Sequence, residues 1–307
     1  MAGSRLDQVT RWVARRRAWV QAAFLVIWLD PFLLRLHNVC GPVFHCYSCP
    51  LAFLACPIGV VANFSALHLF PFAAVGTLVA IGAIVGTAVC GWACPFGFLQ
   101  DMAAKIPTPR FRIPAWAGYT RYLVLISLVV FVPYLWGEAH PLFFCRVCPA
   151  GALEGALPNT VRMYREGNGL VLPSTIKLAV LVAVLVGMLF AVRPWCKLFC
   201  PLGAIFAMFN RASVFVLRFR TDACRTCGQC DKMCRYGVLP NASVNNGRCI
   251  RCLECTRCSA LMVGTVFAGS SAGSPQGPAG MGRDRSGPPD EEPPCNVCGT
   301  PPSNTVQ

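Results

Sequence analysis

Two cysteine runs, 224–234 (CRTCGQCDKMC) and 249–258 (CIRCLECTRC), decide how the C-terminal part of this 307-residue chain folds. Each run has three cysteines at two-residue intervals and a fourth a little further on, and fourteen residues separate the runs. Thiols at such short spacing are usually metal ligands or partners in disulfides. The eight cysteines therefore predict a metal-binding or disulfide-bonded module.

The spacing is that of the cluster ligands in bacterial ferredoxins. In those proteins the fourth cysteine of each run ligates the cluster of the other run, so we expect two crossed sets of ligands. One set is Cys224, Cys227, Cys230 and Cys258, and the other is Cys249, Cys252, Cys255 and Cys234. A zinc site built from C-x2-C knuckles and a disulfide framework are the alternatives. Three cysteines in one run exceed a zinc knuckle, which favours two [4Fe–4S] clusters.

The composition of the chain is that of a membrane protein. Of its residues, 55% are hydrophobic and only 13% are charged, whereas a soluble domain has about 25% charged residues. Its 20 cysteines fall largely in C-x2-C and C-x3-C groups, which favours metal ligation over a secreted disulfide scaffold. The net charge of +14 lies largely beside apolar runs, and no nucleic-acid motif accompanies it. We therefore expect a membrane and not a nucleic acid as partner.

Four apolar runs are close to the ~20 residues that cross a bilayer. They lie at 18–36, 66–89, 116–136 and 174–192. The N-terminal segment is rich in arginine, and the loop between the first two runs has neither Lys nor Arg. By the positive-inside rule we expect a multi-pass protein of the bacterial inner membrane with both termini in the cytoplasm. A shorter apolar stretch at 201–217 is expected to be an interfacial helix.

These features divide the chain into four parts. We expect a cytoplasmic basic N-terminus at 1–17, a membrane domain at 18–217, a ferredoxin-like module at 218–263 and a disordered tail at 264–307. The predicted fold class is mainly α, a polytopic bundle of about four spans with the two-cluster module after it. Cys295 and Cys298 in the tail are too few to complete a tetrahedral site alone, and their role stays open.

The membrane domain contains an internal repeat. Each half has a C-x2-C-P motif before a span and a C-x3-C-P motif after it. The C-x2-C-P motif occurs at Cys46/Cys49 and again 99 residues later at Cys145/Cys148. The C-x3-C-P motif occurs at Cys90/Cys94 and again 106 residues later at Cys196/Cys200. Sites in repeated membrane proteins tend to lie where the repeats meet. We therefore expect equivalent motifs to come together.

The expected topology places the two kinds of motif at opposite faces of the membrane. The C-x3-C-P cysteines lie at the cytoplasmic face and the C-x2-C-P cysteines at the other. Each set supplies four thiolates, the number that one [4Fe–4S] cluster requires. For the C-x2-C-P set disulfides are an open alternative, because Cys40 and Cys56 raise the cysteines of that region to six.

The motifs CGWACPFGFLQD (90–101) and WCKLFCPLGA (195–204), together with the two cysteine runs, resemble the NapH, NosR and YccM-like family of membrane iron–sulfur proteins. The resemblance covers about residues 18–263. It implies electron transfer between the membrane quinol pool and a redox partner. It also implies that the C-x3-C-P cysteines and the eight cysteines of the runs ligate clusters.

We therefore expect membrane-bound electron transfer through [4Fe–4S] clusters, between the quinone pool and a redox protein. The enzymatic form of this activity would be a quinol dehydrogenase-type subunit. Because the hydrocarbon layer is ~30 Å thick, either the C-x2-C-P set dips into it or a quinone bridges the gap. The second hypothesis is an accessory protein that handles copper or iron during cofactor assembly, since thiolates near the outer face would suit Cu(I).

Overall fold

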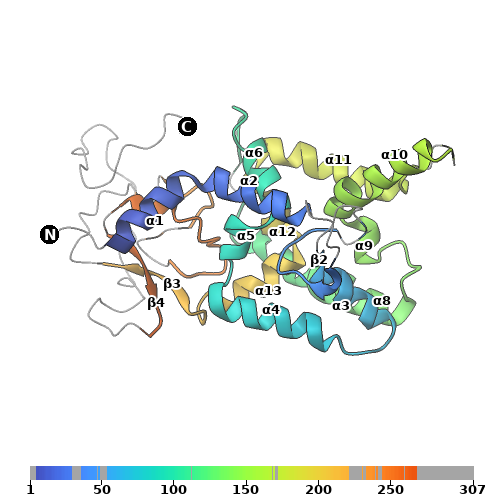
Figure 1. The fold of residues 1–307 in the computed structure, drawn as a ribbon, viewed down its shortest axis with the longest axis horizontal. Helices are drawn as coiled ribbons and strands as arrows, with labels where there is room; N and C mark the ends of the chain where they lie inside the picture. The colour runs from blue at the N-terminus through green and yellow to red at the C-terminus, as the bar shows by residue number, and fades with distance from the viewer. Residues whose placement is uncertain are drawn as a thin grey trace.

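Most helices of the computed structural model lie between a small β-sheet at one end and a group of short helices at the other (Figure 1). The structure describes residues 5–29, 36–46, 48, 54–111, 113–167, 169, 172–220, 230, 233–238, 240, 244–258 and 260–267. Most of these residues are helical, which confirms the mainly α prediction.

The elements follow one another in two halves. The first half contains α1 (Arg5–Arg15), α2 (Arg17–Trp28), β1 (Leu36–Cys40), β2 (Leu54–Ala55), α3 (Pro57–Ala66), α4 (Phe72–Val85), α5 (Ala88–Trp92) and α6 (Pro95–Ala103). The second contains η1 (Trp116–Tyr119), α7 (Thr120–Val124), the π-helix η2 (Leu125–Phe131), α8 (Val132–Trp136), α9 (Phe144–Val147), the π-helix η3 (Gly151–Ala156), α10 (Leu157–Arg165), α11 (Thr175–Phe190), α12 (Pro194–Leu198) and α13 (Pro201–Phe209). β3 (Phe215–Phe219) then pairs antiparallel with β4 (Leu261–Thr265), and the 3-10 helix η4 (Glu254–Arg257) precedes β4.

In the part of the chain that the structure describes, one helix is long and apolar enough to cross a membrane. It is the 21-residue segment Trp116–Trp136, which coincides with the third expected span. The other expected spans contain shorter apolar helices, because α2, α4 and α11 have 12, 14 and 16 residues. In the described part of the chain, the bundle of four full-length spans is therefore not confirmed.

Buried polar groups shorten two of these helices. α4 ends at Gly86, whose φ of +54° is left-handed, and a Cβ there would lie 2.8 Å from Asn210 Oδ1 and 2.9 Å from Arg251 Nη1. Only glycine leaves room for these side chains. α11 ends shortly before Arg193, which is also left-handed (φ +52°) and only 1% exposed. The apolar runs continue in sequence beyond the points where tertiary contacts end the helices.

The prediction of an interfacial helix at 201–217 is wrong. Helix α13 packs against α4 and α7, and its residues Leu202, Ala204 and Phe206 are at most 2% exposed. The last part of the stretch belongs to strand β3 instead. Most apolar side chains of α13 are thus covered by neighbouring parts of the protein, as expected of a core helix, and Met208 is the exposed exception.

The two halves fold alike around their C-x3-C-P motifs. In each half a five-residue helix, α5 or α12, leads to a nine-residue helix, α6 or α13, that begins with proline. At the junction the Cys94 N–H donates to the Val89 carbonyl at 3.1 Å, and the Cys200 N–H donates to the Trp195 carbonyl at 2.9 Å. The repeat that the sequence indicates is therefore a repeat of local structure.

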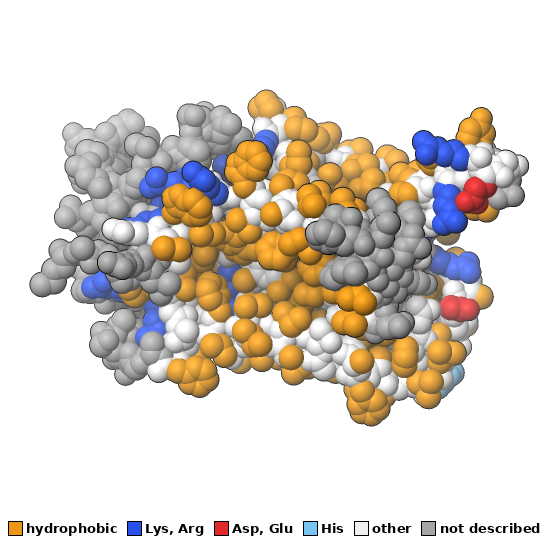
Figure 2. Space-filling view, viewed as in Figure 1, with side chains coloured by type: hydrophobic (Ala, Val, Ile, Leu, Met, Phe, Trp, Pro, Cys, Tyr) orange, Lys and Arg blue, Asp and Glu red, His pale blue; other side chains and the backbone are white. Residues whose placement is uncertain are grey.

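Apolar side chains cover much of the middle of the face in Figure 2. Lys and Arg lie mainly toward its two ends, and the Asp and Glu side chains in view lie at the right. This distribution suits a protein with an apolar belt between two polar regions. Inside the molecule, the Phe44 ring lies 5.9 Å from that of Phe96 and 6.2 Å from those of Phe144 and Trp195, between centroids. Such an aromatic group makes a large apolar contribution to the core.

Candidate metal centres

The four C-x3-C-P cysteines line one cavity of about 50 Å³. Of these cysteines, Cys90, Cys94 and Cys200 are buried and Cys196 is partly buried. They come from equivalent positions of the two halves, so the structure brings together the set that the repeat predicts. Ligation of a cluster by these cysteines stays a prediction.

The local fold explains the order Cys-Pro-x-Gly in these motifs. Cys94 and Cys200 cap helices α6 and α13, and their sulfurs accept hydrogen bonds of 3.4 Å from the N–H groups of Gly97 and Gly203. Proline fits the first helical position because it has no N–H to satisfy there. A Cβ on Gly97 would lie 2.9 Å from the Cys90 carbonyl oxygen, so a larger residue would push the two ligand segments apart. The helix dipole also favours negative charge on a capping sulfur.

The residues around this cavity can accommodate a metal cluster. Burial raises the pKa of the Cys196 thiol, and Arg193 opposes that rise without overcoming it. Thiolates in such a pocket are costly unless a metal compensates their charge. The cavity is also lined by Trp195, whose buried Nε1–H has no hydrogen-bond partner in the described structure and is available to a cluster sulfide.

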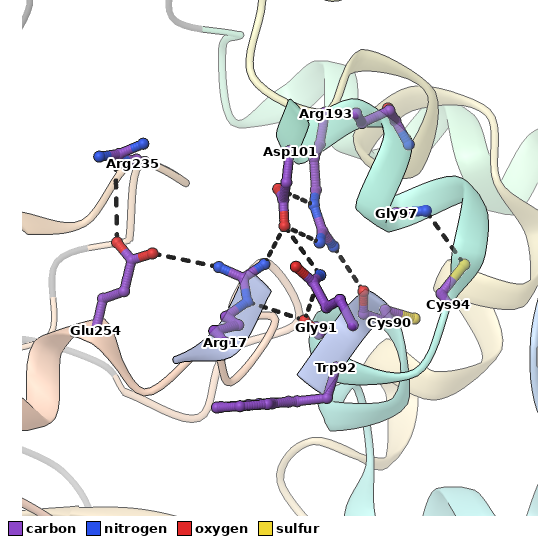
Figure 3. Close-up of polar contacts among 12 residues, drawn as sticks. Arg17, Cys90, Gly91, Trp92, Cys94, Gly97, Asp101, Arg193, Arg235 and Glu254 are labelled. Carbon is purple, nitrogen blue, oxygen red and sulfur yellow. Dashed lines mark hydrogen bonds and ion pairs between the residues drawn. The ribbon is translucent and has the colours of Figure 1, made fainter. Parts of the chain in front are cut away.

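A polar network that the sequence analysis missed supports the same cysteines (Figure 3). Asp101 accepts hydrogen bonds from Arg193 at 2.7 and 2.6 Å and is also paired with Arg17. Arg193 Nη1 donates to the Cys90 carbonyl at 2.7 Å, and Arg17 Nε donates to the Gly91 carbonyl at 2.9 Å. The network thus holds the backbone of the first C-x3-C-P motif from both sides.

The charges of this network stabilise one another. Burial raises the pKa of Asp101, but Arg193 and Arg17 outweigh that effect and hold the pKa below its ordinary range. The sequence contained a partial signal, because Asp101 closes the motif CGWACPFGFLQD and Arg193 lies three residues before Cys196. Arg17 carried no such signal, since arginines before an apolar run are expected at a membrane surface.

A second, smaller cavity of about 20 Å³ lies in the ferredoxin-like segment. Its lining includes Cys234, Cys249, Cys252 and Cys255, the four cysteines that the spacing assigns to one cluster. Of the other set, Cys224 and Cys227 lie outside the described residues. Cys230 and Cys258 are buried in a small core with residues of β3 and β4. The structure therefore brings one expected ligand set together and leaves the other as a prediction.

The two cavities are neighbours. Ile250 and Tyr236 line both of them. Trp92 Nε1 donates to the Arg251 carbonyl at 2.9 Å, and Thr87 Oγ1 donates to the Cys249 carbonyl at 2.6 Å. The ferredoxin-like loop is therefore docked directly on the C-x3-C-P motif.

The C-x2-C-P cysteines are only partly described. Cys46, Cys145 and Cys148 lie near one another, and Cys49 lies outside the described residues. Cys56, which the sequence analysis left without a role, lies with the three. In the described structure Cys46, Cys56, Cys145 and Cys148 form no disulfides.

Among the described residues, no group of three or more His, Cys, Asp or Glu side chains is close enough to hold a single metal ion. A structural zinc site would need four ligand atoms about 2.0–2.3 Å from one ion. A [4Fe–4S] cluster has a different requirement, because each of its four irons takes one thiolate.

Comparison with known protein families gives two matches to one family, described as a 4Fe–4S binding domain, at residues 67–114 and 175–220. Each match contains one apolar helix and one C-x3-C-P motif. The matches therefore fall on the repeat rather than on the two cysteine runs near the C-terminus.

Several curated proteins are similar over much of this chain. An uncharacterized protein of Methanocaldococcus jannaschii is 32% identical over 187 residues, which are 58% of this chain and 70% of that protein. The putative electron transport protein YccM of Escherichia coli is 23% identical over 228 residues, 72% of this chain and 60% of YccM. Protein NirI of Paracoccus denitrificans is 29% identical over 185 residues, 56% of this chain and 24% of NirI. No solved structure matches the chain.

Proposed function

The chain belongs to the NapH, NosR and YccM-like family of membrane iron–sulfur proteins, and on that premise we propose that it transfers electrons at the membrane through [4Fe–4S] clusters. The observation that carries the proposal is that Ile250 and Tyr236 line both cysteine cavities. These two residues form a wall that the cavities share. Two cluster sites that share lining residues would be neighbours, as direct electron transfer requires. YccM, which is described as a putative electron transport protein, supports the same role.

The residues around the first cavity suit this role. When bound, a [4Fe–4S] cluster accepts and releases one electron. Phe44, Phe96 and Trp195 line the cavity with apolar surface and restrict the access of water. Arg193 and Arg121 also line it and oppose the negative charge of the thiolates. Buried cations of this kind raise a reduction potential, because they stabilise the more negative reduced state.

We assign a quinol as one redox partner and a protein as the other. The first cavity extends to Ile113, Pro114 and Gly118, at the start of the Trp116–Trp136 helix. This helix would bring the cavity close to the lipid, where a quinone dissolves. The activity would then be that of a quinol dehydrogenase-type electron-transfer subunit.

Two cysteine substitutions test the cluster assignment. Cys252→Ala and Cys196→Ala should each lose about one cluster, or about four irons per protein, because alanine cannot ligate iron. Only Cys252→Ala should remove a ferredoxin-type signal from low-temperature EPR spectra. Iron and acid-labile sulfide would be measured in anaerobically purified protein. Stoichiometric copper in place of iron would instead support a metal-handling accessory protein.

We further propose a multi-pass protein of the bacterial inner membrane with both termini in the cytoplasm. Phe267 follows β4 and is 82% exposed, so a fusion after it should leave the core intact. Green fluorescent protein fused there should fluoresce, and alkaline phosphatase fused there should be inactive. The opposite pair of results would place the ferredoxin-like segment in the periplasm and reverse the proposed topology.

A further inference from the structure

The sequence Cys-Pro-x-Gly occurs four times in the chain. Its copies are CPIG at 56–59, CPFG at 94–97, CPAG at 148–151 and CPLG at 200–203. Two of the copies supply Cys94 and Cys200 to the first cavity. Cys49 is also followed by proline, but alanine stands at 52, where the glycine of the motif would be. By this pattern the counterpart of Cys148 in the first half is Cys56, not Cys49.

The backbone has nearly the same conformation at the four cysteines of these motifs. Their φ and ψ angles are −69° and 121° at Cys56, −76° and 119° at Cys94, −71° and 120° at Cys148, and −73° and 111° at Cys200. The Gly151 N–H donates to Cys148 Sγ at 3.3 Å, as in the two motifs of the first cavity. The Gly59 N–H is also close to the Cys56 sulfur, but it makes no capping hydrogen bond to it. Cys56 therefore has the backbone of a ligand cysteine.

Packing brings Cys56 to the cysteines of the second half. Helix α3, which begins after Cys56, packs against α9, which contains Cys145. A Cβ on Gly151 would lie 3.6 Å from both Cys46 Sγ and the Cβ of Cys148. Cys56 and Cys145 pack against the buried core cluster that contains Cys148, and the Cys46 sulfur is also a neighbour of Cys148. Four thiols, two from each half, thus meet at one place.

The surroundings of this group resemble those of the first cavity. A Cβ on Gly155 would lie only 3.0 Å from Cys46 Sγ, so the π-helix η3 passes close to that sulfur. Turns of π-helix are frequent at functional sites. Lys177 Nζ lies 3.6 Å from the same Gly151 Cβ position and supplies a positive charge beside the thiols. Glu154 accepts a 2.9 Å hydrogen bond from the Cys46 N–H and fixes that ligand segment.

The group also lies close to the first cavity. The Phe44 N–H is close to the Cys94 sulfur. Phe44 is two residues before Cys46. Two residues of backbone span at most about 7 Å. The segment that carries Cys46 therefore lies close to the C-x3-C-P cysteines.

We propose that Cys46, Cys56, Cys145 and Cys148 bind a further [4Fe–4S] cluster, with Cys56 as the fourth ligand in place of Cys49. This site would extend the row of clusters beyond the first cavity, and in that respect it rests on the proposed function. Cys40, which lies in strand β1, is not a ligand in this proposal and serves as the control position.

The test compares single alanine variants of the full chain, purified without oxygen. Cys56→Ala and Cys148→Ala should each lose about four irons and four sulfides per protein. Cys40→Ala and Cys49→Ala should keep the full amount. Retention of all iron in Cys56→Ala, or loss of four irons in Cys49→Ala, would overturn the assignment of Cys56.

Two further measurements separate the remaining explanations. The ferredoxin-type EPR signal and the elution volume of Cys56→Ala should match those of the parent, which distinguishes the loss of one cluster from misfolding. If the four cysteines form disulfides, Cys56→Ala keeps its iron and gains a thiol for alkylation, which overturns the proposal. A parent without iron would overturn the proposed function as well, whereas an iron-containing parent matched by Cys56→Ala overturns this site alone.

Discussion

Asp101→Ala is expected to destabilise the protein by about 3–5 kcal/mol, since removing one partner of a buried ion pair leaves an uncompensated charge. The charge left behind is that of Arg193, which is 1% exposed and donates to Asp101 at 2.7 and 2.6 Å. Arg17, 7% exposed, would lose the same partner. Thermal unfolding in detergent, followed by tryptophan fluorescence, measures the effect.

The matched control is an ion pair at the surface. Arg162 and Glu166 lie one turn apart on and just after α10, with side chains 65% and 49% exposed. Glu166→Ala should leave the unfolding temperature unchanged, because solvent screens such pairs. Equal unfolding temperatures for Asp101→Ala and Glu166→Ala would show that Asp101 does not hold the network together.

The pH dependence of this contribution has a definite sign. The pKa of Asp101 is lower in the folded protein than in the unfolded chain. Its stabilising contribution is therefore fully present above the unfolded value of about 3.9, and it is lost as the pH falls through the lower folded value. The difference in stability between the parent and Asp101→Ala should accordingly be constant near neutral pH and shrink only in strong acid.

The sequence predicted those features that depend on local spacing. The equal spacing of the C-x3-C-P motifs in two halves indicated that Cys90 and Cys196 would meet, and the structure places them on one cavity. The apolar run at 116–136 needed no tertiary information, because its length and composition alone make it a candidate span. Cys249, Cys252 and Cys255 line one cavity with Cys234, as the spacing of ferredoxin ligands predicts.

The sequence could not predict features that depend on distant partners. Arg17 looks like a membrane-flanking residue, but its partners Asp101 and Glu254 are 84 and 237 residues away. Helix α4 ends early because Asn210 and Arg251 lie against Gly86, and both come from later parts of the chain. Cys56 is a different case, because its Cys-Pro-x-Gly pattern is visible in the sequence, whereas a count of C-x2-C motifs selects Cys49 instead.

Gly91→Ala is expected to slow electron transfer from the first cavity to the ferredoxin-like clusters by at least about tenfold, since processes that depend on positioning are sensitive to displacements of about 1 Å. A Cβ on Gly91 would lie 2.5 Å from the Ile250 carbonyl oxygen, closer than any real contact. Because the obstacle is backbone, the loop must move, and Ile250 forms part of the wall that both cavities share. The ligand cysteines themselves are unchanged, so the iron content should stay that of the parent.

The rate would be measured by mixing the protein with a reduced quinol analogue and following the ferredoxin-type EPR signal in rapidly frozen samples. Gly76→Ala is the matched control, because a Cβ at that position of α4 meets nothing within 4 Å. It should transfer electrons at the parent rate. Parent-like transfer in Gly91→Ala with full iron would mean that electrons do not pass through the wall of Ile250. Loss of iron would instead show that the substitution disturbs the neighbouring Cys90, the proposed ligand, so the two effects are distinguished by the same samples.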